Sequence, residues 1–183
     1  MTVITYSRHS GTDAAMGLDD FLSAYEEVYA EPPYNEGPRD VAEFIEHYDA
    51  HTQRAGMRLI LAREGAEVVG FAYGYYLAPD TRWWANLQDV QLPSAYTRED
   101  GRRTFVILEM AVRKPWRRRG ISTALHERLL DGVEAQRVTL TVRPEPEAAP
   151  ARAAYVAWGY ESLGTSHPWD DAPFYECMVR PLR

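Results

Sequence analysis

Residues 104–132 constrain the fold more than any other part of the chain, because three patterns follow one another without a gap. The run "TFVILEMAV" (104–112) is apolar apart from Glu109, which is typical of a strand covered on both faces. From 120 to 132 the apolar residues Ile121, Ala124, Leu125 and Leu129 recur at the spacing of one helix face. The stretch between them, 113–119, holds five basic residues. The segment therefore predicts a buried strand, a basic loop and an amphipathic helix in direct succession.

The basic loop has the properties of an anion site. The free backbone N–H groups of residues 119–123 would point at one spot, and a helix N-terminus carries partial positive charge. Gly120 lets the backbone come close to a ligand, and the arginines add charge-assisted hydrogen bonds. A solvated basic loop or a nucleic-acid patch would also be basic. The net charge of −7 and the position between a buried strand and a helix argue against a nucleic-acid partner and favour a phosphate-bearing ligand.

The rest of the chain alternates between strand and helix patterns. Apolar residues at helical spacing predict helices over 18–30, over 41–51 and from the segment after 143 to about Trp158, where Gly159 is placed to cap the helix end. Residues 79–103 show no clear period and predict a long loop. The β-rich runs predict strands at 2–7, 57–64, 67–78, 137–142 and 171–182. The pair 57–64 and 67–78 reads as a hairpin, so the expected α/β arrangement has a mixed sheet.

Length and composition limit the class of protein. With 183 residues, 45% of them hydrophobic, we expect one domain over residues 1–183. No run of about 18 apolar residues and no signal-peptide pattern is present, which favours a cytosolic protein without a membrane partner. The lone Cys177 excludes an internal disulfide and any multi-cysteine zinc site, and the histidines lack metal-ligand spacing, so no metal is expected.

Two segments resemble the GNAT superfamily of N-acetyltransferases. The segment "AVRKPWRRRGISTALHERLL" is similar to the strand, pyrophosphate loop and helix of that family, whose loop follows the pattern Gln/Arg-x-x-Gly-x-Gly/Ala. Arg117, Gly120 and Ser122 fill the three positions, with Ser122 departing from the usual Gly or Ala. The segment "ARAAYVAWGYE" looks like the family's later helix, with Tyr155 four residues before a Gly–aromatic pair.

The resemblance implies a fold and a donor substrate. The fold would be a single α+β domain, in which a mixed, mostly antiparallel sheet contains a splayed parallel pair, 104–112 and 137–142, flanked by about four helices. The donor would be acetyl-CoA. By resemblance, its pantetheine arm and diphosphate would contact Met110, Ala111, Val112, Arg117, Arg118, Arg119, Gly120, Ile121, Ser122 and Thr123. Ala148 stands where the family often has an Asn, which removes one expected hydrogen bond.

The implied reaction needs a base for the amine and an acid for the leaving thiolate. Tyr155 matches the family's general acid, and its alternative is a helix-face tyrosine packed into the core. Glu109 is the best candidate for the base, since a carboxylate within an apolar strand would have its pKa raised by desolvation. A structural or substrate-binding role for Glu109 remains an alternative, as does a water chain acting as the base. Cys177 is expected to be a buried small hydrophobe, and His126 a surface helix residue.

The acceptor amine is the least constrained part of the hypothesis. Two irregular segments, residues 31–38 between the first two predicted helices and residues 79–103, contain aromatic and acidic residues that would together favour a cation. These candidates are Tyr34, Trp83 and Trp84, with Tyr96, Glu31, Glu36, Asp80 and Asp89. We therefore expect an acetyltransferase acting on a primary amine of a small cationic molecule. A non-catalytic acyl-CoA-binding regulatory domain and a protein or peptide amine acetyltransferase stay open, and so does a homodimer.

Overall fold

The computed structural model describes residues 2–183. The chain divides into two compact units. The first consists of residues 2–75 with 107–133, and the second of residues 76–106 with 134–183. None of the helices within the described residues is long and apolar enough to cross a membrane.

The first unit contains an antiparallel hairpin covered by helices. Its elements are β1 (Ile4–His9), α1 (Gly11–Met16), α2 (Leu18–Tyr29), α3 (Pro38–Thr52), β2 (Arg58–Glu64), β3 (Glu67–Tyr76), most of β4 (Thr104–Val112), the short 3-10 helix η2 (Lys114–Trp116) and α5 (Ile121–Leu130). Strand β2 pairs antiparallel with β1 and with β3. The β2–β3 turn contains Gly65 at φ +62°, a left-handed conformation that suits glycine in a two-residue hairpin. This confirms the predicted hairpin.

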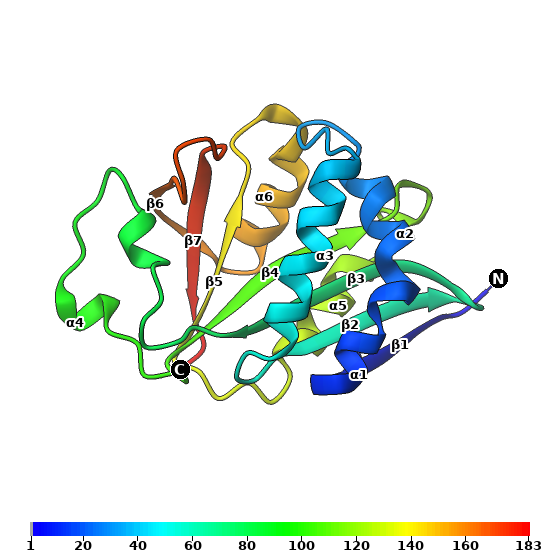
Figure 1. Ribbon diagram of the computed structural model, residues 1–183, viewed down its shortest axis with the longest axis horizontal. Helices are drawn as coiled ribbons and strands as arrows, with labels where there is room; N and C mark the ends of the chain where they lie inside the picture. Colours follow the sequence, from blue (N-terminus) through cyan, green and yellow to red (C-terminus); the bar gives the residue numbers. More distant parts are fainter. Residues whose placement is uncertain (1) are drawn as a thin grey trace. The chain divides into compact units, whose positions relative to one another are not determined.

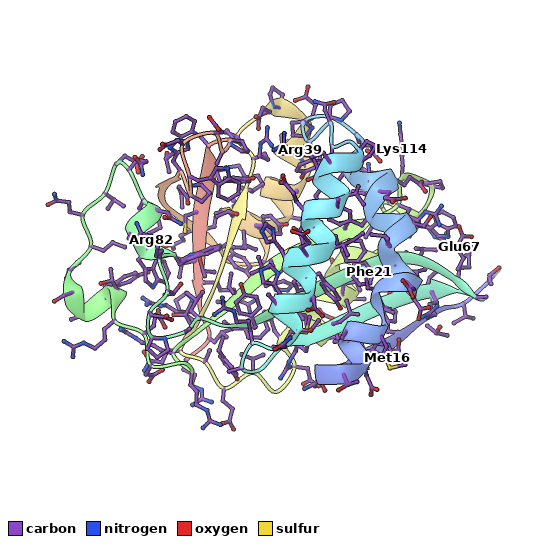
Figure 2. The ribbon with its side chains drawn as sticks, viewed as in Figure 1. Met16, Phe21, Arg39, Glu67, Arg82 and Lys114 are labelled. Atoms are coloured by element: carbon purple, nitrogen blue, oxygen red, sulfur yellow. The ribbon has the colours of Figure 1, made fainter. Side chains whose placement is uncertain are left out.

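Helices lie on both faces of these strands. Helices α2 and α3 lie in front of β1–β3, and α5 lies behind them (Figure 1). In front, Phe21 of α2 packs between its helix and the strands, with its ring 4.6 Å from that of Phe71 (Figure 2). Behind, a Cβ on Gly70 would lie 3.2 Å from Leu125 of α5. Phe71 and Gly70 are adjacent in β3, so they point to opposite faces of the sheet.

The second unit is a sheet edged by irregular segments. Its elements are the first residues of β4, η1 (Trp84–Asn86), α4 (Ser94–Thr97), β5 (Arg137–Val142), η3 (Pro146–Ala148), α6 (Ala149–Ala157), β6 (Glu161–Ser166) and β7 (Tyr175–Pro181). Strands β4 and β5 are parallel over Thr104–Val106, whereas β7 pairs antiparallel with both β5 and β6. The strand order of the sheet is β1-β2-β3-β4-β5-β7-β6.

The predicted fold class is confirmed: the sheet is mixed and mostly antiparallel, with β4 and β5 as its parallel pair. Four helices, α2, α3, α5 and α6, are longer than two turns. The splay of the parallel pair and the single domain stay predictions. Besides the one-turn 3-10 helices, three elements were missed: α1, β6 and α4, which lies within the predicted loop 79–103. The sequence of β6, "ESLGTS", is polar and contains Gly164, so it lacks the apolar alternation of a half-buried strand.

Candidate active site

The predicted strand, loop and helix form as expected in the first unit. Strand β4 ends at Val112 and α5 begins at Ile121. Gly120, the residue before α5, has φ +77°, and a Cβ there would meet no atom within 4 Å. Helix α5 has no side-chain cap, so the N–H groups of its first turn, on Ile121, Ser122 and Thr123, are available to an anion. The residues present therefore fit the diphosphate of acetyl-CoA.

Carboxylates from the same unit hold three of the five basic residues in this loop. Arg117 donates to both carboxylate oxygens of Glu31, at 2.8 and 2.9 Å, and its Nε donates to the carbonyl of Val112. Arg119 pairs with Glu64 at 3.3 Å. Arg113 pairs with Glu27 and with Glu67, two further acidic residues. Glu31 was predicted to lie in the acceptor site; the structure shows it bound to the loop.

The other two basic residues carry charge that these carboxylates do not neutralise. Within residues 2–183, Lys114 and Arg118 form no ion pair, and both side chains are exposed. Lys114 extends outward from the loop (Figure 2). Arg118 has φ +61°, a left-handed conformation that a non-glycine residue rarely adopts. The loop thus holds the guanidinium of Arg118, which has no ion-pair partner among the described residues, two positions before Gly120.

We expect Arg118→Gln to weaken acetyl-CoA binding about tenfold, because one charge-assisted contact to the diphosphate would be lost. Glutamine is no better suited than arginine to a positive φ, so the backbone strain is unchanged. Isothermal titration calorimetry with acetyl-CoA measures the change, and Arg39→Gln on the exposed face of α3 is the control. Equal affinities in the two variants would exclude Arg118 from the donor site.

Glu109 lies on β4 in the first unit, where Tyr29 of α2 donates a hydrogen bond to its Oε2 atom. Burial raises the pKa of Glu109 to about 8; the Tyr29 hydrogen bond lowers it and the charge of Glu36 raises it. Within the described residues, no side chain or backbone group bonds to Oε1. Glu109 therefore has one oxygen fixed and one free, at a pKa near neutrality, which are the properties of a general base.

Aromatic rings surround the Tyr29–Glu109 pair. The Tyr29 ring lies 4.5 Å from that of Tyr25 and 4.8 Å, edge-on, from that of Tyr34. Tyr25 donates a 2.7 Å hydrogen bond to Glu36 Oε2. Three tyrosine rings and two carboxylates thus lie together in the first unit. Of these, the sequence identified Glu109, Tyr34 and Glu36 as candidates; Tyr25 and Tyr29 were predicted only as members of an apolar helix face.

Tyr155 lies in the second unit, near the C-terminal end of α6. Its ring contacts those of Trp158 and Tyr160 edge-on, at 5.8 and 5.9 Å, and the residue is half-buried. Gly159 has φ +93° and follows the helix end, as predicted. The role of Tyr155 stays a prediction.

The two tryptophans proposed for the acceptor site are held by other residues of the second unit. Trp84 is 5% exposed and donates to Glu99 at 2.8 Å, while the guanidinium of Arg137 lies 4.5 Å from its ring. Trp83 donates to the hydroxyl of Thr139 at 3.2 Å. The cation that lies against the Trp84 ring is therefore Arg137 of the protein itself.

Two other residues were assigned from the sequence. Cys177 is buried, which raises the pKa of its thiol to about 11, so it behaves as the predicted small hydrophobe. His126 was predicted on the surface, and this was wrong: it is 3% exposed, next to the fully buried Leu125. No group of three histidine, cysteine or acidic residues within 2–183 could hold a metal ion.

Strand β4, a member of the parallel pair, leads through a Gly-containing basic loop into the uncapped helix α5, and this arrangement can bind a phosphate-bearing ligand. A sequence model of the Acetyltransferase (GNAT) family matches residues 19–160, which is most of the chain. The protein therefore belongs to the GNAT family of acetyltransferases, and its acyl donor is acetyl-CoA. No protein of curated function matches the sequence significantly.

Solved structures share the fold at low sequence identity. A protein from Pyrococcus horikoshii is 17% identical, with 99% of each chain covered and a TM-score of 0.67. The PaiA N-acetyltransferase from Thermoplasma acidophilum, solved in complex with coenzyme A, is 9% identical over 98% of this chain and 99% of that chain, with a TM-score of 0.62. An aminoglycoside acetyltransferase from an uncultured soil metagenomic sample is 22% identical over 92% of this chain and 99% of that chain, with a TM-score of 0.58.

Proposed function

We propose that this acetyltransferase acts on a primary amine of a small, positively charged molecule, by direct attack of the amine on acetyl-CoA in a ternary complex. The observation that supports it most is Glu109, whose Oε2 is bound by Tyr29 and whose pKa is raised to about 8. A carboxylate at that pKa can take a proton from an ammonium near neutral pH.

In the proposed reaction each proton has a defined place. The free Oε1 of Glu109 takes a proton from the ammonium, directly or through a water. The neutral nitrogen then attacks the thioester carbonyl, a C–N bond forms, and the C–S bond breaks. The hydroxyl of Tyr155 gives its proton to the leaving thiolate, as the resemblance to the family's general acid suggests. After the attack, the former amine nitrogen carries one proton more than the amide product needs. It gives this proton to the ionised oxygen of Tyr155, which returns Tyr155 to its neutral state.

The donor would be held by the loop that precedes α5. The first-turn N–H groups of Ile121, Ser122 and Thr123 would bind the diphosphate, with the exposed Arg118 adding charge. Holding both reactants in line supplies much of the rate enhancement in a reaction of this kind. The strand residues Met110, Ala111 and Val112 are proposed to follow the pantetheine arm, with Arg117 and Arg119 positioned beside the diphosphate.

The preference for a cationic acceptor rests on the cluster around Glu109. Glu36 and Glu109 bring acidic groups to the rings of Tyr25, Tyr29 and Tyr34, and aromatic faces with carboxylates attract cations. One of the similar structures is an aminoglycoside acetyltransferase, which is consistent with an acceptor of this class. Of the acceptor-binding candidates Tyr34, Trp83 and Trp84, Tyr34 is the one whose ring contacts Tyr29 in this cluster.

A thiol-release assay with purified protein and acetyl-CoA tests the proposal. The panel contains spermidine and kanamycin, which carry several positive charges, glucosamine, which carries one, and glutamate, which is acidic. We expect the highest kcat/KM with spermidine or kanamycin, and a decrease with added salt because screening weakens charge attraction. Higher kcat/KM with glutamate than with every cationic amine of the panel would exclude the cationic preference. Turnover confined to peptide N-termini would identify a protein acetyltransferase instead.

We expect Tyr155→Phe to lower kcat about 100-fold while leaving acetyl-CoA affinity unchanged, because the phenyl ring keeps the packing but cannot donate a proton. Tyr76→Phe, which removes a hydroxyl bonded to the N–H of Glu134, is the control and should keep full turnover. The measurement is kcat with the best amine of the panel, together with the Kd of acetyl-CoA. Unchanged kcat in Tyr155→Phe would reduce this residue to a packing role.

A further inference from the structure

Beyond Glu109 itself, the first unit contains groups that control how this carboxylate is held. Tyr29 lies in the last turn of α2 and Glu109 lies on β4, eighty positions later in the sequence. The Tyr29 hydroxyl bonds to Oε2 only, so Oε1 is the oxygen left to exchange a proton. A carboxylate with one oxygen fixed presents the other in a defined direction.

We propose that Tyr29 is a positioning residue, whose hydroxyl holds Glu109 Oε2 and so sets the direction in which Oε1 is presented. This inference rests on the proposed role of Glu109 as the base.

The Tyr29 ring has little freedom to move. It is 8% exposed, and the rings of Tyr25 and Tyr34 contact it. Tyr25 is fixed in turn, since its ring stacks on Phe44 at 3.8 Å and its hydroxyl bonds to Glu36. Residues 25 and 29 are one helical turn apart on α2, so one face of the helix presents both hydroxyls to two carboxylates.

The ionisable groups that face Glu109 come from three elements. Tyr25 and Tyr29 belong to α2, Glu36 to the segment between α2 and α3, and Tyr73 to β3. Burial and the charge of Glu109 raise the pKa of all three tyrosines, so they stay protonated and each keeps a proton to donate. Tyr29 stabilises the charged carboxylate by its hydrogen bond, whereas the charge of Glu36 destabilises it.

These two effects have opposite signs, which makes the inference testable with a pair of variants. Tyr29→Phe removes the donor, so the midpoint of Glu109 ionisation should move up by about one pH unit. Glu36→Gln removes a like charge but keeps an oxygen that can accept from Tyr25, so the midpoint should move down. Tyr48→Phe is the matched control, because it also removes a buried hydroxyl, here one bonded to the carbonyl of Ala14.

The titration is followed by carbon-13 NMR of protein labelled at the δ-carbon of glutamate, with the Glu109 signal assigned by its loss in Glu109→Gln. This readout needs no acceptor. The ascending limb of kcat/KM against pH, measured with the best amine of the panel, should shift in the same direction as each NMR midpoint.

Opposite shifts in Tyr29→Phe and Glu36→Gln, with none in Tyr48→Phe, would support the inference. An unchanged midpoint in Tyr29→Phe, or a loss of rate at every pH without a shift, would overturn it. Full turnover in Glu109→Gln would overturn the proposed base instead, so the two failures are distinguishable.

Discussion

Glu109→Gln is expected to lower kcat/KM about 1000-fold at pH 8, which lies within the usual contribution of a positioned general base. The glutamine amide keeps an oxygen that can accept from Tyr29, so the packing is preserved while the proton acceptor is lost. The base is active when it is ionised, and its pKa is raised to about 8, so wild-type kcat/KM should rise with pH up to that region. The variant should lose this rise.

The control is Glu43→Gln, the same chemical change on the exposed face of α3, which should leave kcat/KM unaltered. Initial rates with the best amine of the panel, from pH 6 to 9, provide the comparison. A Glu109→Gln enzyme with more than a tenth of wild-type kcat/KM would indicate a water chain as the base.

Glu109 also affects stability in a way that needs no substrate. Because its pKa is raised above the ordinary value near 4.5, the folded protein keeps a proton that the unfolded chain releases. The protonated carboxyl therefore contributes stability that is fully present below about pH 4.5 and is lost as pH rises through about 8. Wild-type stability should fall across this window relative to that of Glu109→Gln.

The sequence predicted the buried parts of the donor region well, for physical reasons. The strand at 104–112 was predicted with its observed bounds because its residues are apolar almost without interruption. The helix after Gly120 was predicted because Ile121, Leu125 and Leu129 share one face, and all three are buried. Patterns of this kind are local, and a single chain segment displays them completely.

Contacts between segments that are distant in the sequence could not be predicted from such local patterns. Tyr29 follows the helical spacing of Leu18, Leu22 and Tyr25. This spacing predicts a buried ring and gives no information about a partner for the hydroxyl. Its bond to Glu109 becomes visible only once α2 packs against the strands. His126 was predicted to be exposed because it is polar, but the orientation of α5 buries it.

Part of the acidic composition serves to pair with the basic loop, and the net charge of −7 alone does not reveal this. Carboxylates at the end of α2 and at the β2–β3 hairpin pair with the arginines of the loop, namely Glu27, Glu31, Glu64 and Glu67. These pairs hold the loop in shape while leaving Lys114 and Arg118 for a ligand. Three of the five basic residues in the loop therefore have their charge balanced by nearby carboxylates.

In the second unit, Arg137→Met is expected to lower the free energy of unfolding by about 3–5 kcal/mol, the usual cost of breaking a buried ion pair from one side. Arg137 donates to Glu99 at 2.9 Å, to the carbonyl of Tyr96 at 2.7 Å and to the hydroxyl of Thr104 at 2.8 Å. The side chain of Glu99 is 0% exposed, and its Oε2 already lacks a hydrogen-bond partner among the described residues. Without Arg137, its charge would have no cation and no water to stabilise it.

Two comparisons separate this mechanism from a general loss of packing, both by urea denaturation. Adding Glu99→Gln to Arg137→Met removes the stranded charge, so the double variant should be more stable than Arg137→Met alone. Arg152→Met breaks a partly exposed pair with Glu176 and should cost about 1 kcal/mol or less. If Arg137→Met costs no more than Arg152→Met, then the buried pair contributes little. If the double variant is the less stable one, the loss comes from the packing of the Arg137 side chain between Trp84 and Tyr96.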